Sequence, residues 1–181
     1  LLSYVFVFTV IALAELLRSF FKLPGEFTRK FIHIGVGHWI IAAIFLIEKR
    51  LIATIPPLTF MGINYLSMKR SLFKAMDMQV QPTYGTVYYA FSLFLLTALF
   101  WTPSLQYLLL LGVMIMAWGD GLAAVVGKHF GKKKLPLTPF TKTYLGSATM
   151  LIVSYIVALI ILNTMAPTTN ISYQALAIIA A

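Results

Sequence analysis

"SLQYLLLLGVMIMAWGDGLAAVVGKHFGKKK", residues 104–134, decides the fold of this chain. Its first part, residues 104–118, carries no charged side chain, which predicts a membrane-spanning helix that reaches residue 126 if it stays helical past Trp118. One acid, Asp120, stands at the end of this apolar run, and a cluster of lysines follows it. The stretch therefore predicts a membrane protein with a charged site at the end of one span.

The composition of the whole chain agrees with a bilayer environment. Hydrophobic residues make up 60% of the 181 residues, charged residues only 10%, and the mean hydropathy is +0.90. We expect an all-α, polytopic helical bundle that forms a single domain over residues 1–181 of a natural chain extending beyond both ends. There are no cysteines, which excludes disulfide and thiol chemistry.

Seven spans are predicted, and the positive charges indicate their orientation. The expected ranges are about 1–17, 31–47, 51–66, 85–101, 104–118, 146–163 and a last one from 171. Twelve of the fourteen cationic residues lie on alternate loops. They are Arg18, Lys22, Arg29 and Lys30, then Lys69, Arg70 and Lys74, then Lys128, Lys132, Lys133, Lys134 and Lys142. The positive-inside rule puts these loops in the cytoplasm and the N-terminus outside. Because the charges follow the loops, the pI of 9.9 does not predict a nucleic-acid partner.

The first polar group is "EFTRKFIHIGVGH", residues 26–38, where the second span begins. On a helix, Arg29, His33 and Gly37 follow one another at i+4 steps, with Lys30 beside them. A cationic stripe at membrane depth predicts an anionic partner or substrate. The alternative is that Arg29 and Lys30 reach the lipid headgroups and that His33 is a packing residue.

The second polar group is "QPTYGTVYYA", residues 81–90, before the fourth span. Its tyrosines, Tyr84, Tyr88 and Tyr89, are typical of the aromatic belt at a membrane interface. Gly85 and Thr86 offer backbone and hydroxyl donors, which is a weaker indication of a site.

The third group is centred on Asp120. If the helix continues, Asp120, Ala123 or Ala124, and Gly127 lie on one face, where small residues let another backbone or a ligand come close. An acid at this depth needs a cation, either a loop lysine or a divalent metal. A single carboxylate with phosphate oxygens nearby is typical of a magnesium–nucleotide site, because Mg²⁺ keeps waters and takes few protein ligands.

The residues after Asp120 supply cations and flexible backbone for phosphate. Gly127 and Lys128 are followed by Gly131 and Lys132, and the pair Lys142 and Thr143 precedes the sixth span. The N-terminus of that span, with Gly146 and Ser147, is expected to offer free N–H groups to phosphate. The spacing does not match a Walker A loop.

These motifs together resemble a known family. "GDGLAAVVGKHFGKKKLP" (119–136) followed by "KTYLGSATM" (142–150) is similar to the signature of the CTP-dependent polyprenol and lipid-alcohol kinases, which include dolichol kinase and phytol kinase. "RKFIHIGVG" (29–37) and "YGTVYYA" (84–90) resemble two further motifs of the same group. The related CDP-diacylglycerol synthases usually carry Glu where this chain has Leu145, so the resemblance favours the kinase branch.

The resemblance implies a multi-pass enzyme that transfers the γ-phosphoryl group of CTP, with Mg²⁺, to a lipid alcohol at the cytoplasmic membrane face. In that hypothesis the catalytic residues are Asp120, His33 and Lys142. Asp120 holds the metal, Lys142 and other cations neutralise the phosphates, and His33 or Asp120 acts on the alcohol. The expected nucleotide-binding residues are Arg29, Lys30, Gly119, Gly121, Gly127, Lys128, Gly131, Lys132, Lys142, Thr143, Gly146 and Ser147. A CDP-diacylglycerol synthase-like cytidylyltransferase and a non-enzymatic transporter or lipid-binding protein remain the alternatives, and a homodimer is left open.

Overall fold

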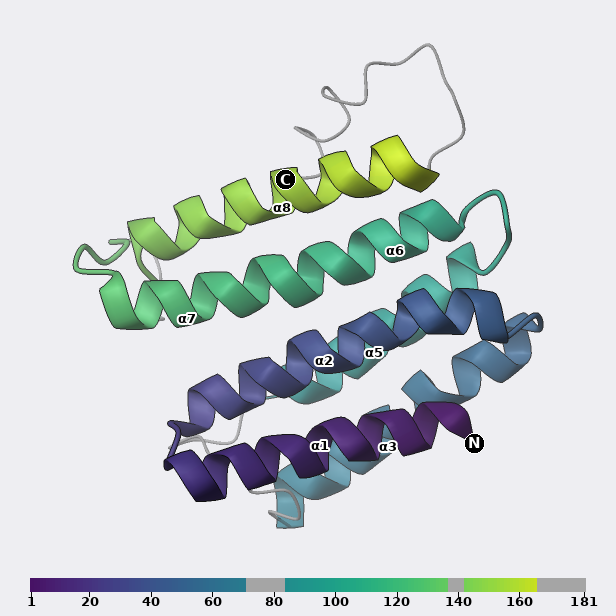
Figure 1. Cartoon of the computed structure of the whole chain (residues 1–181), viewed down its shortest axis with the longest axis horizontal. Helices are drawn as coiled ribbons and strands as arrows, with labels where there is room; N and C mark the ends of the chain where they lie inside the picture. The colour runs from purple at the N-terminus through teal and green to yellow at the C-terminus, as the bar shows by residue number, and fades with distance from the viewer. Residues whose placement is uncertain (71–83, 137–141, 166–181) are drawn as a thin grey trace. The chain divides into compact units, whose positions relative to one another are not determined.

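The structure, a computed structural model, describes residues 1–70, 84–136 and 142–165. Within these ranges the chain folds into apolar helices (Figure 1), which confirms the predicted all-α membrane architecture. The elements are α1 (Leu2–Phe21), α2 (Gly25–Leu46), α3 (Arg50–Arg70), α5 (Gly85–Phe100), α6 (Gln106–Met114), the π-helix η1 (Ile115–Asp120), α7 (Gly121–Phe130) and α8 (Tyr144–Met165). The predicted seventh span and Lys74 lie outside the described residues.

The described helices match the six spans expected before residue 171. Five helical stretches are long and apolar enough to cross a membrane, the fourth of them running without a break from Gln106 to Phe130 through α6, η1 and α7. The span at Gly85–Phe100 is a shorter apolar helix. Hence the helix that begins in the apolar run at 104–118 does continue past Asp120, as its sequence suggested.

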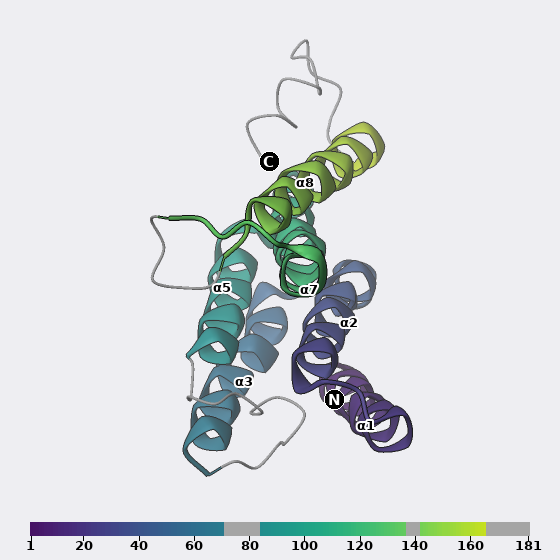
Figure 2. The same ribbon diagram turned by 90° about the vertical axis from the view of Figure 1, so that its left-hand side faces the viewer.

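Contacts between helices divide the chain into two compact units, Leu1–Leu109 and Leu110–Ala181. In the first unit, α1 packs on α2, and α3 packs on α5 (Figure 2). α1 ends where Lys22 adopts a left-handed conformation (φ 51°, ψ 39°), and Pro24 precedes the first turn of α2. This sharp connection turns the chain back on itself, so that Val7, Ile11 and Ala14 of α1 bury against Ile32 of α2.

The first unit is also joined between its helix pairs. Tyr4 of α1 lies within hydrogen-bond distance of Thr59 of α3 (2.7 Å between the hydroxyl oxygens), and its ring packs on Phe60. In the second unit, α8 lies against both η1 and α7 along their length (Figure 1). The C-terminal end of α7 therefore meets the N-terminal end of α8, and Gly127, Thr143 and Gly146 lie at this junction.

Candidate active site

Asp120 is the last residue of a π-helical segment. η1 covers Ile115–Asp120 and is followed directly by the regular helix α7, whose first N–H, that of Gly121, donates to the carbonyl groups of Ala117 and Trp118. A π-helical turn holds more residues than an α-helical turn, which rotates the residues after it relative to those before it, and such segments are frequent at functional sites. Asp120 is exposed, whereas its neighbours Gly119 and Gly121 are buried. The π segment thus presents a carboxylate on an otherwise buried part of the helix.

The small residues near Asp120 serve the close approach of α8. A Cβ atom on Gly119 would stand 2.8 Å from Ser154 Oγ, and one on Gly127 would stand 3.1 Å from Gly146 Cα. A Cβ atom on Gly146 would stand 3.0 Å from the carbonyl oxygen of Ala123. The sequence left open whether another backbone or a ligand approaches these small residues. Within the second unit, Gly127 and Gly146 bring the backbones of α7 and α8 together, whereas Gly119 meets α8 side chains.

Thr143 holds this junction together through its side chain. The residue is 6% exposed, and its hydroxyl accepts a hydrogen bond from the N–H of Gly146 (3.1 Å) and donates to the carbonyl of Gly127 (3.3 Å). Thr143 is therefore the N-cap of α8 as well as a link to α7. A Cβ atom on Gly131 would overlap the Thr143 side chain, standing 2.6 Å from the Thr143 Cβ. Only glycine therefore fits at this position, where the chain leaves α7.

The first turn of α8 has fewer unpaired backbone N–H groups than the sequence predicted. The N–H of Tyr144 donates to the carbonyl of Lys133, that of Gly146 to Thr143 Oγ1, and that of Ser147 to the carbonyl of Thr143. Three of the first four N–H groups of the helix are thus already paired within the protein. The expected phosphate site at this helix N-terminus consequently has to rest on side chains rather than on these backbone donors.

The lysines that follow α7 form part of a short antiparallel pairing. Lys134 and Thr143 form a β-bridge, flanked by hydrogen bonds from Leu135 N–H to the Lys142 carbonyl (2.9 Å) and from Tyr144 N–H to the Lys133 carbonyl (3.2 Å). The lysines here are all exposed, namely Lys128, Lys132, Lys133, Lys134 and Lys142. The paired segments, residues 132–136 and 142–144, are called the basic hairpin below. It is anchored at Thr143, and its lysines are exposed to an anionic ligand.

In the first unit, the cationic residues of α2 differ in their surroundings. Arg29 forms an ion pair with Glu26 one turn earlier (2.7 Å between Nη2 and Oε1), and both side chains are mostly buried. Lys30 is only 7% exposed. A lysine that is almost wholly buried in the protein does not match one that extends to the lipid headgroups.

His33 is contacted by the second polar motif. The ring of Tyr89 from α5 lies 3.9 Å from the His33 ring, centroid to centroid, and the Tyr89 hydroxyl donates to the His33 backbone carbonyl (2.9 Å). Tyr84 and Tyr88 are 51% and 65% exposed, which agrees with the expected interfacial aromatic belt for these two residues. The sequence motifs "RKFIHIGVG" and "YGTVYYA", which lie about fifty residues apart in the chain, thus meet in one unit.

Sequence reasoning overlooked polar residues on α3. Asn64 and Ser67 are 7% and 1% exposed, and the side-chain amide of Asn64 donates to the backbone carbonyl of Thr86 in α5 (3.0 Å). Their spacing of three residues within an apolar span was the available signal, because polar side chains inside spans commonly join helices. Asn64 therefore fixes the first turn of α5, three residues before Tyr89.

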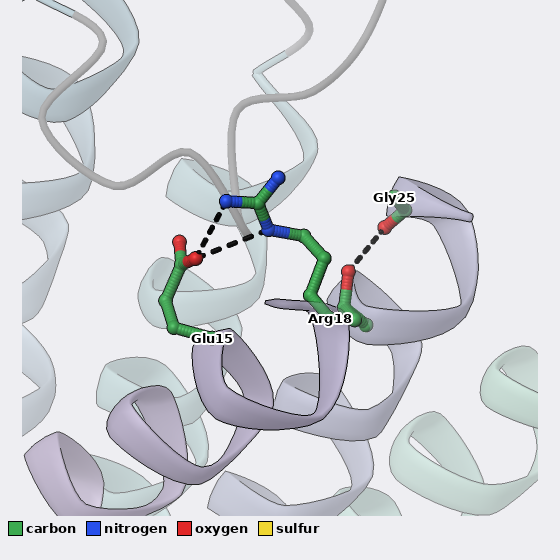
Figure 3. A network of polar contacts seen from close by, with 4 residues as sticks. Glu15, Arg18 and Gly25 are labelled. Atoms are coloured by element: carbon green, nitrogen blue, oxygen red, sulfur yellow. Dashed lines mark hydrogen bonds and ion pairs between the residues drawn. The ribbon is translucent and has the colours of Figure 1, made fainter. Parts of the chain in front are cut away.

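A second ion pair lies where α1 ends. Arg18 donates from both Nε (3.0 Å) and Nη2 (2.8 Å) to one carboxylate oxygen of Glu15 (Figure 3). Figure 3 also shows the carbonyl of Gly25, which accepts a hydrogen bond from Thr28 Oγ1 (3.0 Å) in the first turn of α2. Both ends of the α1–α2 connection are held by local contacts, which orients the turn of α2 that carries Arg29 and Lys30.

The described residues suit a metal bound with a nucleotide better than a metal held by protein alone. Within them, no group of three or more His, Asp or Glu residues is placed to hold a metal ion. Asp120 offers one exposed carboxylate directly before α7, and exposed lysines lie at the end of that helix and in the pairing that follows it. Mg²⁺ in nucleotide sites takes one or two carboxylates, with phosphate oxygens and waters as its other ligands, so the donor set fits that kind of site.

Comparison with known proteins identifies the family. The chain is 33% identical over 162 residues to phytol kinase from Synechocystis, and the match covers 90% of this chain and 70% of that protein. The chain belongs to the phytol kinase family. Probable phytol kinase 2 from rice, Oryza sativa subsp. japonica, is 30% identical over 172 residues, a match that covers 82% of this chain and 54% of the rice protein.

The phytol kinase match confirms the predicted family. Probable phytol kinase from wheat, Triticum aestivum, is 33% identical over a shorter segment of 79 residues, which covers 44% of this chain. No protein-family model matches the chain, and no solved structure matches it. Membership of the phytol kinase family therefore rests on whole-sequence similarity to these relatives.

Proposed function

We propose that this protein is a CTP-dependent kinase that phosphorylates the hydroxyl group of an isoprenoid alcohol, with phytol as the first substrate to test. The observation that carries the proposal is the identity of 33% over 90% of the chain to a phytol kinase. The choice of CTP follows from the motif resemblance at residues 119–150. The exposed Asp120 and the basic hairpin support a phosphate-handling role for that segment.

The proposed reaction is a direct phosphoryl transfer. The alcohol oxygen attacks the γ-phosphorus of CTP, the bond from that phosphorus to the bridging oxygen breaks, CDP leaves, and the proton of the alcohol passes to a base. Such a reaction is accelerated mainly by positioning and by neutralising phosphate charge, so a protein needs cations and a fixed geometry more than covalent chemistry.

The residues of the second unit would handle the phosphates. Asp120 would hold Mg²⁺, which when bound neutralises negative charge on the phosphate oxygens. Lys128, Lys132 and Lys142 would supply further positive charge from exposed positions at the end of α7 and in the hairpin. Gly127, Gly131 and Thr143 would act indirectly, since their contacts hold α7, α8 and the hairpin together.

The residues of the first unit would supply phosphate-handling and alcohol-handling groups of their own. Arg29, oriented by Glu26, and Lys30 would neutralise phosphate charge, and His33, held by Tyr89, would orient the alcohol or accept its proton. Asp120 is the other candidate for the base. The apolar helices would hold the prenyl chain beside the reacting hydroxyl group, which gives a physical reason for a kinase built almost wholly of membrane helices.

The test is an assay of the purified, detergent-solubilised protein with γ-labelled CTP, Mg²⁺ and phytol. We expect label to appear in phytyl phosphate, and farnesol, polyprenol, dolichol and diacylglycerol define the range of acceptors. Label released as pyrophosphate would instead identify a cytidylyltransferase. Absence of both products, together with no thermal stabilisation by CTP, would favour a transporter or lipid-binding protein and refute the proposed activity.

A further inference from the structure

A buried hydroxyl group on α8 lies against the π-helical segment that ends at Asp120. Ser154 is 0% exposed, and a Cβ atom on Gly119 of η1 would stand 2.8 Å from Ser154 Oγ. Met150, one turn earlier on α8, lies in the same contact, with its Sδ atom 2.9 Å from that Cβ position. The residue directly before the acid therefore packs on a polar atom of the neighbouring helix.

The Ser154 hydroxyl has no hydrogen-bond partner. Within residues 110–136 and 142–165, the described part of the second unit, it is the one buried side-chain polar atom that lacks a partner. A hydroxyl group inside a helix can donate to the carbonyl four residues earlier, as Thr149 and Thr164 of α8 do at 2.9 Å and 2.7 Å. Because a buried hydroxyl without a partner lowers stability, its presence indicates either a bound water or a functional role.

The segment that contacts Ser154 contains carbonyl groups that can accept a further hydrogen bond. Where η1 passes into α7, the N–H of Gly121 is shared between the carbonyl groups of Ala117 and Trp118. A carbonyl oxygen has two lone pairs, so each of these groups can accept a hydroxyl donor beside its share of this bond. Both carbonyl groups belong to the last turn before Asp120, and a bond to either would restrain the backbone that carries the acid.

We propose that Ser154 is a positioning residue for Asp120. Its hydroxyl donates to the carbonyl of Ala117 or Trp118 while the Asp120 carboxylate holds the metal of the nucleotide. The inference rests on the proposed function, and it adds a residue that lies outside all the sequence motifs. The physical reason is that a side chain at the end of a π-helical segment is only as well placed as the backbone before it, so a bond from the neighbouring helix fixes the carboxylate for its ligand.

Two purely structural roles of Ser154 make different predictions. A hydroxyl bonded to a buried water stabilises the protein with or without a nucleotide, so Ser154→Ala would lower the thermal midpoint in both conditions. A hydroxyl that is only tolerated in the interface would raise the midpoint when it is removed and would leave turnover unchanged. A positioning hydroxyl combines a midpoint that is unchanged or higher without ligands with weaker use of the nucleotide.

The experiment compares wild type, Ser154→Ala and the control Thr164→Val, which removes an exposed hydroxyl group from the same helix. Wild-type activity with CTP, Mg²⁺ and phytol is measured first, because its absence would refute the proposed function itself, whereas the variants of an active protein test the inference alone. We expect Ser154→Ala to lower kcat/KM for CTP about fivefold, the effect of one neutral hydrogen bond, and to leave the KM for phytol unchanged. It should also reduce the rise in thermal midpoint that Mg²⁺ and CTP cause, and Thr164→Val should change none of these quantities.

A double variant tests whether Ser154 acts through the acid. Ser154→Ala combined with Asp120→Asn should keep the residual activity of Asp120→Asn alone, because the bond no longer has a metal ligand to position. A further fivefold loss in the double variant would overturn the inference. So would a lower midpoint of Ser154→Ala without ligands, which would indicate a bound water, and so would an unchanged kcat/KM for CTP, which would indicate a tolerated hydroxyl.

Discussion

Thr143→Val tests the junction of α7 and α8, because it replaces a hydroxyl group by a methyl group at nearly constant volume. In the native protein that hydroxyl accepts from the Gly146 N–H at 3.1 Å and donates to the Gly127 carbonyl at 3.3 Å. Thr143 is 6% exposed, so water does not readily replace either contact. The substitution therefore removes a helix cap and an interhelical hydrogen bond at the same time.

The cap is the larger of the two contributions. Loss of an N-cap hydroxyl costs about 1 kcal/mol. A hydrogen bond between membrane helices contributes about 0.6 kcal/mol on average, and the 3.3 Å bond to Gly127 is a long one. Together they give about 1.5 kcal/mol of lost stability. At roughly 2–4 °C per kcal/mol for a chain of this size, the thermal midpoint should fall by about 3–6 °C.

The assay is thermal unfolding of the detergent-solubilised protein, followed by circular dichroism, with Thr143→Ser as the matched control. Serine keeps the hydroxyl and loses only the methyl group, so its midpoint should stay close to that of the wild type. If Thr143→Val unfolds at the wild-type temperature, the hydroxyl does not hold this junction. If Thr143→Ser falls as far as Thr143→Val, the methyl group is responsible and the hydrogen-bond argument is wrong.

The remaining predictions concern the glycine contact, the acid and the second motif. Gly127→Ala should destabilise the protein, because the new Cβ would stand 3.1 Å from Gly146 Cα. The control Gly62→Ala, whose Cβ would have nothing within 4 Å, should leave the thermal midpoint unchanged or raise it. Equal midpoints for the two variants would refute the close contact. Asp120→Asn should reduce CTP-dependent phosphorylation by a factor on the order of 100 or more in folded protein, and near-normal turnover would remove Asp120 from the site. Tyr89→Phe should keep most activity, because the ring against His33 remains, whereas Tyr89→Leu should lower kcat. Identical kcat values for the two variants would show that the ring does not position His33.

The membrane helices were predictable from the sequence because their signal is local. A run of apolar residues must be helical in a bilayer, where every backbone donor needs a partner within its own segment. Each span predicted before residue 171 accordingly falls on a described helix, although α2 begins six residues before its predicted start and the helix from Gln106 continues to Phe130. The π-helical segment at Ile115–Asp120 was not predicted, since apolar composition carries no signal for the register of a helix.

The site was predictable only in part. Charges and glycines in an apolar chain marked the motifs, but the partners of these residues depend on contacts between distant parts of the chain. The stacking of Tyr89 on His33 and the hydrogen bond from Asn64 to Thr86 each join separate spans. Gly146 and Ser147 were expected to leave free N–H groups, yet the cap by Thr143 and the first helical bond use them.

The sequence by itself determined that this protein is helical and membrane-embedded, and that its polar residues gather in a few motifs, because the low solubility of charge in hydrocarbon restricts where such residues stand. Its overall similarity to phytol kinases also determined the family. Only the tertiary structure decided what the small residues near Asp120 pack against, which hydroxyl caps α8, and that Lys134 pairs with Thr143. The physical reason is that strand pairing and helix packing select among several directions that are equivalent in the sequence.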